Sequence, residues 1–313
     1  MKRFAISAIA AAMVVLQAAA ALAWSEREVA TGGLHGTLTL PAGGATAPAV
    51  LILAGSGPTD RNGNFPGAFN DSLKLIAHGL AAQGIASLRV DKRGVAASAA
   101  AAPREEDLRV ETYVADVISW IEVLRAEPTV SGVILAGHSE GALMATLAAQ
   151  RAQIAGLILL AGAGEPADRI IARQLAVAGV SKTLQDTSRR ITDSLREGRT
   201  VADIPRDLLL LYRPSVQPYL TSWLPIDPAA ELAKVAAPAL IVQGTTDLQI
   251  LVEDANRLAA ARPDAKRVVI DGMNHVLKIA PASRQENLQS YARPGVPLAP
   301  ALLPAIVAFI RGV

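Results

Sequence analysis

The sequence predicts an α/β fold in which a mostly parallel, twisted sheet is covered by helices on both faces. Short apolar runs rich in Val, Ile and Leu alternate along the chain with longer stretches of helical pattern. Strands that are apolar throughout are typical of parallel sheets buried on both sides. The chain has 313 residues, 51% of them apolar, so it can bury one large core.

The predicted elements follow one another in a regular order. Residues 26–40 are expected to form an antiparallel pair of strands at the leading edge of the sheet. The expected parallel strands are residues 49–53, 85–90, 133–136, 157–160, 239–242 and 266–270. The expected helices between them and after them are residues 72–83, 111–126, 142–151, 253–261 and 301–311.

This order is interrupted between the fourth and fifth parallel strands, where more than seventy residues carry no strand pattern. Residues 163–235 are charged and helix-prone, and they predict a helical cap insertion over the carboxyl ends of the strands, where open α/β sheets bind ligands. The remaining domain, residues 24–162 and 236–313, is the predicted core. The alternative is a run of ordinary crossover helices. Three cap helices are expected, at residues 168–178, 184–197 and 201–212.

The first 23 residues have the pattern of a secretory signal peptide. Lys2 and Arg3 precede an apolar stretch that ends in Ala21-Leu22-Ala23, which predicts cleavage after Ala23. An uncleaved membrane anchor is the alternative. The chain contains no cysteine, which excludes a lipid-anchored lipoprotein and structural disulfides. We therefore expect a periplasmic or secreted protein with no stable membrane anchor after cleavage.

The mature chain is expected to be formally neutral. Without Lys2 and Arg3, 28 of the 30 Lys and Arg residues remain, against 28 Asp and Glu residues. A neutral chain does not predict a nucleic-acid partner. The sequence has no His/Cys cluster and no phosphate-binding glycine loop with its lysine, so no metal and no organic cofactor are expected.

The pentapeptide Gly137-His138-Ser139-Glu140-Gly141 lies between a predicted strand and a predicted helix. A Gly-x-Ser-x-Gly segment in this context is typical of a nucleophile elbow, a turn so tight that the serine hydroxyl stands clear of the sheet. The alternative is a glycine-rich turn whose serine only caps the helix. We predict that Ser139 is a nucleophile.

A serine nucleophile needs a histidine base, and the chain has four histidines. His35 lies in the leading hairpin, His78 lies within a predicted helix, and His138 is expected to point away from the nucleophile. His275 follows the last predicted strand directly, where the top of the sheet is expected. Elimination and position therefore favour His275 as the base.

A carboxylate should orient the histidine and stabilise its protonated form. Asp247 follows the penultimate predicted strand, and the chain order Ser139, Asp247, His275 is the order associated with a nucleophile elbow. Asp254 and Asp271 are the rivals. Asp254 lies in the next helix, and Asp271 lies too close to His275 in the sequence to reach around it, so Asp247 is favoured.

The oxyanion of the reaction needs two backbone N–H donors. One is expected from Glu140, the residue after the nucleophile. The other is expected from the glycine-rich loop after the first parallel strand, where the donor is Ser56 or Gly57.

These motifs together resemble the α/β-hydrolase fold over nearly all of the mature chain. The segment Gly55 to Asn64 resembles the oxyanion loop of exported bacterial serine aminopeptidase-like and acyl esterase-type hydrolases, with Asn62 where Asp is usual. The segment Arg89 to Gly94 resembles their "R-x-D-x-RG" turn, although Ala97 replaces a glycine that usually follows. The resemblance implies the fold and the triad more strongly than it implies a substrate.

The expected function is an exported serine hydrolase that cleaves carboxylic esters of small molecules through an acyl-enzyme. An exopeptidase acting on a peptide is the alternative, and it would need an acidic cap residue, such as Glu165, Asp168 or Asp227, to hold the substrate amine. A thioesterase is a further alternative. A non-catalytic ligand-binding member of the fold is the alternative from outside the enzymes. Cap aromatic residues, Tyr212, Tyr219 and Trp223, are expected either to line a substrate pocket or to anchor the cap.

Overall fold

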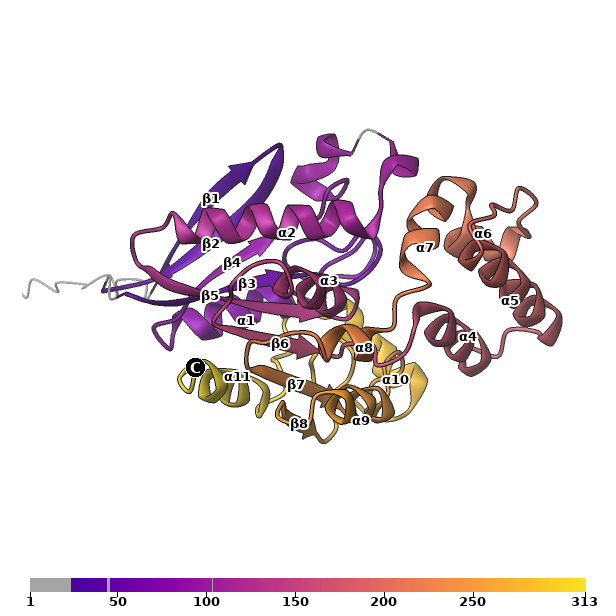
Figure 1. The fold of residues 1–313 in the computed structure, drawn as a ribbon. Coiled ribbons are helices and arrows are strands. Elements are labelled where there is room, and N and C mark those ends of the chain that lie inside the picture. The colour runs from indigo at the N-terminus through magenta and orange to yellow at the C-terminus, as the bar shows by residue number, and fades with distance from the viewer. Residues whose placement is uncertain (1–23, 44–45, 103) are drawn as a thin grey trace, which may run out of the picture.

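The computed structural model describes residues 24–43, 46–102 and 104–313, so the predicted signal peptide lies outside the described residues. A single sheet has the strand order β1-β2-β4-β3-β5-β6-β7-β8, in which β2 is antiparallel to both neighbours and β3 to β8 are parallel (Figure 1). The strands are β1 (Trp24–Thr31), β2 (Leu34–Pro41), β3 (Ala47–Leu53), β4 (Ala86–Val90), β5 (Val130–His138), β6 (Gly156–Leu160), β7 (Ala239–Gly244) and β8 (Lys266–Ile270). The predicted α/β-hydrolase architecture, with helices around a mostly parallel sheet, is confirmed.

Helices cover both faces of the sheet, and each face has its own apolar core. Along β3 the buried side chains alternate: Leu51 belongs to the core on one face, and Val50 and Ile52 belong to the core on the other. This alternation explains why the strand is apolar throughout, because both of its faces are buried. Helices α2 (Val110–Arg125), α3 (Glu140–Ala149) and α9 (Val252–Ala261) pack on the first face, and α1 (Ser72–Ala81) and α11 (Leu302–Ile310) pack on the second.

The order of the strands determines where a ligand can bind. From β3 the chain goes to β4 on one side and then crosses back to β5 on the other side of β3. From β5 it continues away from β3 to β6, so β3 and β5 are adjacent strands whose connections run in opposite directions. Open α/β sheets bind ligands in the crevice at the carboxyl ends of such strands. The loop after β3 and the turn after β5 therefore meet at this crevice.

Four helices between β6 and β7 lie to the side of the sheet, beyond the carboxyl ends of its central strands (Figure 1). They are α4 (Ala167–Val177), α5 (Lys182–Arg196), α6 (Leu209–Tyr212) and α7 (Gln217–Trp223). The following helix, α8 (Pro228–Leu232), instead packs against α3 and α9 of the core. The predicted cap includes residues up to 235, whereas α8 covers the sheet face as a crossover helix does and so belongs to the core.

The predicted cap helix at residues 201–212 is wrong over residues 201–205. Only its last residues are helical, in a 3₁₀ turn at Arg206–Leu208 followed by α6. Gln217 is fully buried, and its side-chain amide bonds the N–H and the carbonyl of Val201, which holds this segment in a non-helical conformation. Pro205 adds a second reason, because it lacks the N–H that a helix interior needs.

No helix in the described part of the chain is both long and apolar enough to cross a membrane. Several further short elements complete the described structure. They are α10 (Arg284–Gln289) after β8 and the 3₁₀ helices Ala96–Ala101, Glu105–Asp107, Pro214–Val216 and Ser290–Ala292. The 3₁₀ helix Ala96–Ala101 lies within the Ala-rich segment after β4.

Helix α2 offers a direct test of the core. Trp120 lies on α2 with only 1% of its surface exposed, in the same core as Leu51 and Leu135. We expect Trp120→Ala to lower the free energy of unfolding by about 3–5 kcal/mol, because it removes a large buried side chain and leaves a cavity. Ser119→Ala, at the neighbouring exposed position of the same helix, should change the free energy of unfolding by less than about 0.5 kcal/mol. Chemical denaturation measures both, and equal effects would contradict the assignment of Trp120 to the core.

Candidate active site

Ser139 lies in a strained turn between β5 and α3. Its backbone has φ 55° and ψ −121°, a conformation that non-glycine residues rarely adopt. The strained turn is tied to the sheet, because the N–H of Ser139 donates to the carbonyl of Leu160, at the end of β6, over 2.9 Å. Strain of this kind persists only where the surrounding structure holds it, and it gathers at functional sites. The geometry is that of the predicted nucleophile elbow.

The two flanking glycines are required by close backbone contacts. A Cβ on Gly137 would lie 2.1 Å from the carbonyl oxygen of Gly141. A Cβ on Gly141 would lie 2.6 Å from the carbonyl oxygens of both Leu53 and Ala54. Any side chain at either position would therefore push β5, α3 and the end of β3 apart, and the close contact between these elements depends on glycine.

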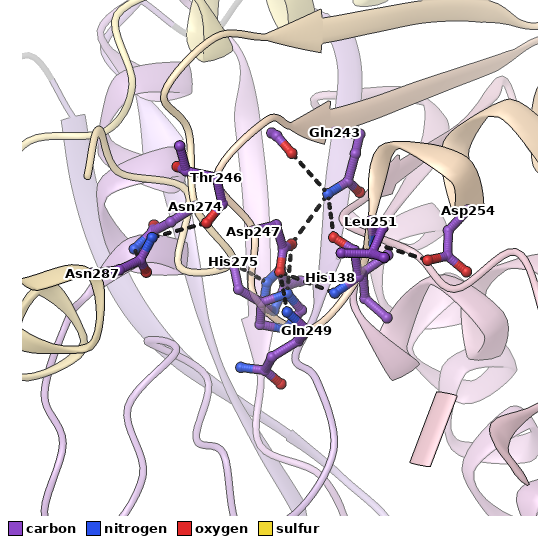
Figure 2. A network of polar contacts seen from close by, with 12 residues as sticks. His138, Gln243, Thr246, Asp247, Gln249, Leu251, Asp254, Asn274, His275 and Asn287 are labelled. Carbon is purple, nitrogen blue, oxygen red and sulfur yellow. Dashed lines mark hydrogen bonds and ion pairs between the residues drawn. The ribbon is translucent and has the colours of Figure 1, made fainter. Parts of the chain in front are cut away.

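His275 and Asp247 meet at the ends of β8 and β7. The Nδ1 of His275 lies 2.8 Å from the Oδ2 of Asp247, and both side chains are buried (Figure 2). A carboxylate can only accept, so Nδ1 carries the proton and Nε2 is left free to accept one. The sequence-predicted acid and base are thus brought together with the tautomer that a general base requires.

Asp247 is held as a carboxylate by several donors. Its Oδ1 accepts the N–H of Gln249 at 2.8 Å and of Ile250 at 3.0 Å, and Gln243 Nε2 donates to its Oδ2 at 3.2 Å. Burial by itself raises the pKa of the Asp247 carboxyl, but His275 and the two backbone N–H groups outweigh it and hold the pKa below its usual value. The negative charge beside His275 is therefore maintained at neutral pH.

The two rival carboxylates have other partners. Asp254 accepts from the N–H groups of Gly164 and Leu251, at 3.0 and 2.9 Å, and pairs with Arg173 of α4. It therefore joins the start of α9 to the cap. Asp271 accepts from the hydroxyl of Thr245 at 2.9 Å.

His138 contributes to the site in a way that the sequence did not indicate. Its Nε2 donates to the carbonyl of His275 over 2.7 Å, and the two imidazole rings lie 4.8 Å apart. Burial and the nearby His275 lower the pKa of His138 to about 3, so its imidazole is neutral at physiological pH. Because His138 directly precedes Ser139, this hydrogen bond holds the turn of Ser139 next to the backbone of His275. No sequence pattern pairs residues 138 and 275, so this contact could not be predicted.

The loops after β7 and β8 are bound to each other by buried polar groups. Asn287 donates to the carbonyl of Thr246 at 2.8 Å, and Asn274 donates to Asn287 at 3.1 Å (Figure 2). Asn274 also donates to the hydroxyl of Ser290, at 2.7 Å. Gly244 permits the close approach, because a Cβ there would lie 1.9 Å from the carbonyl oxygen of Met273. The backbones that carry Asp247 and His275 are therefore fixed relative to each other.

The predicted oxyanion loop lies directly against Ser139. A Cβ on Gly55 would lie 3.1 Å from the Cβ of Ser139 and 3.3 Å from Nδ1 of His138. Ser56 and Gly57 follow at the exposed mouth of the site. The structure thus places the loop next to the turn that carries Ser139 and the N–H of Glu140.

Arg61, further along this loop, has a structural role. It connects the segment Gly55 to Asn64 with the segment Arg89 to Gly94, the two motifs that carry the family resemblance. The backbone N–H and the guanidinium of Arg61 both donate to Asp91, with Nη2 to Oδ2 at 2.8 Å. Both side chains are buried, and the carboxylate raises the pKa of Arg61 against the effect of burial. The loops after β3 and β4 are held together by this ion pair.

Two cavities lie near these groups. One, of about 260 Å³, is lined by Gly57, Lys92, Glu140 and cap residues that include Tyr219. The hydroxyl of Tyr219 donates to Glu140 Oε1 over 2.6 Å, so the cap contacts the residue after Ser139. The other, of about 300 Å³, lies between α4 and the loop after β7 and is mostly apolar, lined by Ile171, Leu175, Leu211, Leu248, Leu288 and Tyr291 among others.

The fold and this arrangement define the class of the protein as an α/β hydrolase. The sequence matches the family described as serine aminopeptidase, S33, over residues 71–279, and the chain belongs to that family. The family resemblance expected from the motifs is confirmed.

A curated relative is the esterase EstD of Thermotoga maritima, which is 28% identical over 261 residues. The match covers 81% of this chain but 60% of EstD, so the chain spans about three fifths of the length of that relative. Among solved structures, Est1E from Butyrivibrio proteoclasticus is similar with a TM-score of 0.56 at 17% identity, covering 92% of this chain and 99% of that one. Proline iminopeptidase from Mycobacterium smegmatis is similar with a TM-score of 0.57 at 16% identity, covering 92% and 98%. At such identities these two structures show a common fold.

The neutral, buried state of His138 predicts an acid-dependent loss of stability. An unfolded chain binds a proton on this imidazole near pH 6.5, whereas the folded chain binds it only near pH 3, so acidification between these values favours unfolding. From pH 6.5 to 4.5 this one group should lower the free energy of unfolding by about 2 kcal/mol. His138→Gln keeps an N–H donor but does not titrate, so its stability should fall less over this range. Denaturant titrations at the two pH values measure the difference, and equal losses in both proteins would contradict the assignment.

Proposed function

We propose that this protein is a serine hydrolase that cleaves carboxylic esters through an acyl-enzyme intermediate. The observation that carries the proposal is the contact of the Asp247–His275 pair with the turn of Ser139, made by the hydrogen bond from His138 to the carbonyl of His275. An activated serine needs a base, and the base needs an orienting carboxylate. These residues supply all three at the carboxyl ends of the central strands.

The reaction follows from these positions. His275 Nε2 takes the proton of Ser139 as its oxygen attacks the ester carbonyl, and Asp247 stabilises the resulting imidazolium. The oxyanion is stabilised by the N–H of Glu140 and an N–H of the loop after β3. His275 then gives its proton to the leaving alcohol, and a water molecule repeats the sequence on the acyl-enzyme.

The cap favours an ester over a peptide as the substrate. An exopeptidase needs a free acidic group for the substrate amine, and the three acidic residues considered for this role are already paired. Glu165 is next to Arg173, and Asp168 is next to Arg196. Asp227 accepts from the first N–H groups of α8 and pairs with Arg257. The mostly apolar cavity near Asp247 suits the apolar part of a small ester. The esterase EstD is consistent with this choice.

Covalent labelling tests the nucleophile. A fluorophosphonate probe should label the purified protein at Ser139, and Ser139→Ala should lose both the label and at least about 10⁴-fold in ester hydrolysis. Ser119→Ala, an exposed serine on α2, should behave as wild type. Peptide mapping after labelling measures the first effect, and steady-state kinetics with nitrophenyl esters measures the second. A folded wild-type protein that takes no label and cleaves no ester would refute the proposal.

The choice between ester and peptide is tested on the same preparation. The kcat/KM for simple acyl esters should exceed that for aminoacyl-naphthylamides, because the three acidic cap residues considered for the substrate amine are each paired with an arginine. Comparable values for the two substrates would instead favour an exopeptidase. Acyl esters of increasing chain length then define the size of the acyl group.

We also propose that residues 1–23 are a signal peptide and that the protein works outside the cytoplasm. The support is the basic start, the apolar stretch and the small residues before Trp24. Expression of the full chain in a bacterial host should give a periplasmic or secreted protein whose first residue is Trp24, as read by N-terminal sequencing of each cell fraction. Ala23→Leu, which replaces a small residue at the cleavage site, should leave the precursor uncut. A chain that keeps Met1 and stays in the cytoplasm would refute export.

A further inference from the structure

Lys92 lies between the two halves of the predicted oxyanion hole. It is the second residue after β4, and its ammonium donates to the carbonyl of Gly55 in the loop after β3. The same ammonium lies 3.6 Å from Oε2 of Glu140, the first residue of α3. The two side chains are 14% and 7% exposed. A single, mostly buried cation therefore contacts both elements that are expected to bind the oxyanion.

The environment of Lys92 makes this position costly. Burial lowers the pKa of the ammonium, and the nearby carboxylate of Glu140 opposes that effect. A charge is held in such a place only with partners that satisfy it. Glu140 is itself satisfied by Lys92 and by the hydroxyl of Tyr219, at 2.6 Å. The cap, the nucleophile turn and the loop after β3 thus converge on this group of side chains.

The geometry of the peptide bond determines what Lys92 can do. The carbonyl of Gly55 and the N–H of Ser56 belong to one peptide unit, which is planar and trans, and no cis bond occurs among the described residues. In a trans peptide the carbonyl and the N–H point in opposite directions. A cation that holds the carbonyl of Gly55 therefore also fixes the direction of the N–H of Ser56.

We propose that Lys92 is a positioning residue that orients the N–H of Ser56 as the second oxyanion donor. The proposal rests on the proposed function. The sequence left Ser56 and Gly57 open as the donor, and the position of Lys92 selects Ser56. Gly55 packs against Ser139, so the peptide unit that joins Gly55 to Ser56 begins beside Ser139. Lys92 acts through the Gly55–Ser56 peptide. Its pairing with the side chain of Glu140 keeps the N–H of Ser56 in place relative to the N–H of Glu140.

Substitution of Lys92 should separate catalysis from binding. Lys92→Met keeps most of the unbranched side chain but removes the ammonium, so the Gly55–Ser56 peptide is no longer held. Loss of an oxyanion donor costs about 10² to 10³ in kcat, and a misdirected donor should cost about 10- to 100-fold. KM should change by less than about threefold, since the donor acts in the transition state. Lys182→Met, which breaks an exposed ion pair with Asp186 on α5, should leave kcat unchanged.

A tetrahedral inhibitor distinguishes this role from a purely structural one. Phenylboronic acid forms a tetrahedral adduct with an activated serine, so its Ki should rise with Lys92→Met by the same factor by which kcat falls. If Lys92→Met does not fold, Lys92→Gln replaces it, because the shorter Gln side chain ends before the carbonyl of Gly55. An unchanged Ki in a folded variant with low kcat, or a wild-type kcat, would overturn the proposal.

A double variant tests the electrostatic alternative. Lys92→Met leaves the carboxylate of Glu140 without its cation, and that charge alone could disfavour the oxyanion. Lys92→Met combined with Glu140→Gln removes the charge, and it should stay as slow as Lys92→Met because the peptide is still not held. Recovery of kcat in the double variant would overturn the positioning role. A wild-type protein that takes no fluorophosphonate and hydrolyses no ester would refute the proposed function and this inference together, whereas an active wild type with an unaffected Lys92→Met would refute this inference alone.

Discussion

The close packing of the turn after β5 against the end of β3 is the constraint on which the site depends. Gly137 and Gly141 leave no room for a side chain, and this allows α3 to start directly above the sheet. The positive φ of Ser139 is tolerated because the core on both faces of β5 holds the turn in place. The strain is local, whereas the packing that maintains it is distributed over many buried apolar contacts. The same packing brings the loop after β3 against Ser139.

The acid and the base depend on a different kind of interaction. Asp247 and His275 are carried by loops, and a loop by itself does not hold side chains at fixed positions. Here the two loops are joined by buried hydrogen bonds of Asn274 and Asn287, and the carboxylate of Asp247 accepts two backbone N–H groups. His138 extends this network from the nucleophile turn to the carbonyl of His275. Buried polar networks in which each group has a partner make a site rigid.

The cap is joined to the core at polar contacts close to the site. Tyr219 of α7 contacts Glu140, and Arg173 of α4 pairs with Asp254 at the start of α9. The edge-to-face packing of Tyr219 on Tyr113 of α2 adds an apolar contact to the first of these. The cap aromatic residues therefore divide their roles: Tyr219 both anchors the cap and lines the cavity beside the nucleophile, whereas Tyr212 is buried within the cap against Ser188.

The sequence by itself determined the order of the core elements, the nucleophile turn and the pairing of Asp247 with His275. These follow from apolar periodicity, from glycine spacing and from chain order, which are local or topological signals. The tertiary structure alone decided the contact of His138 with His275, the position of Lys92 between Gly55 and Glu140, and the non-helical course of the chain from Val201. Each of these depends on residues distant in sequence, or on one buried side chain such as Gln217, whose partners no local pattern reveals. The physical reason is that a buried polar group takes whichever partner the fold brings to it, and that partner is known only when the elements have packed.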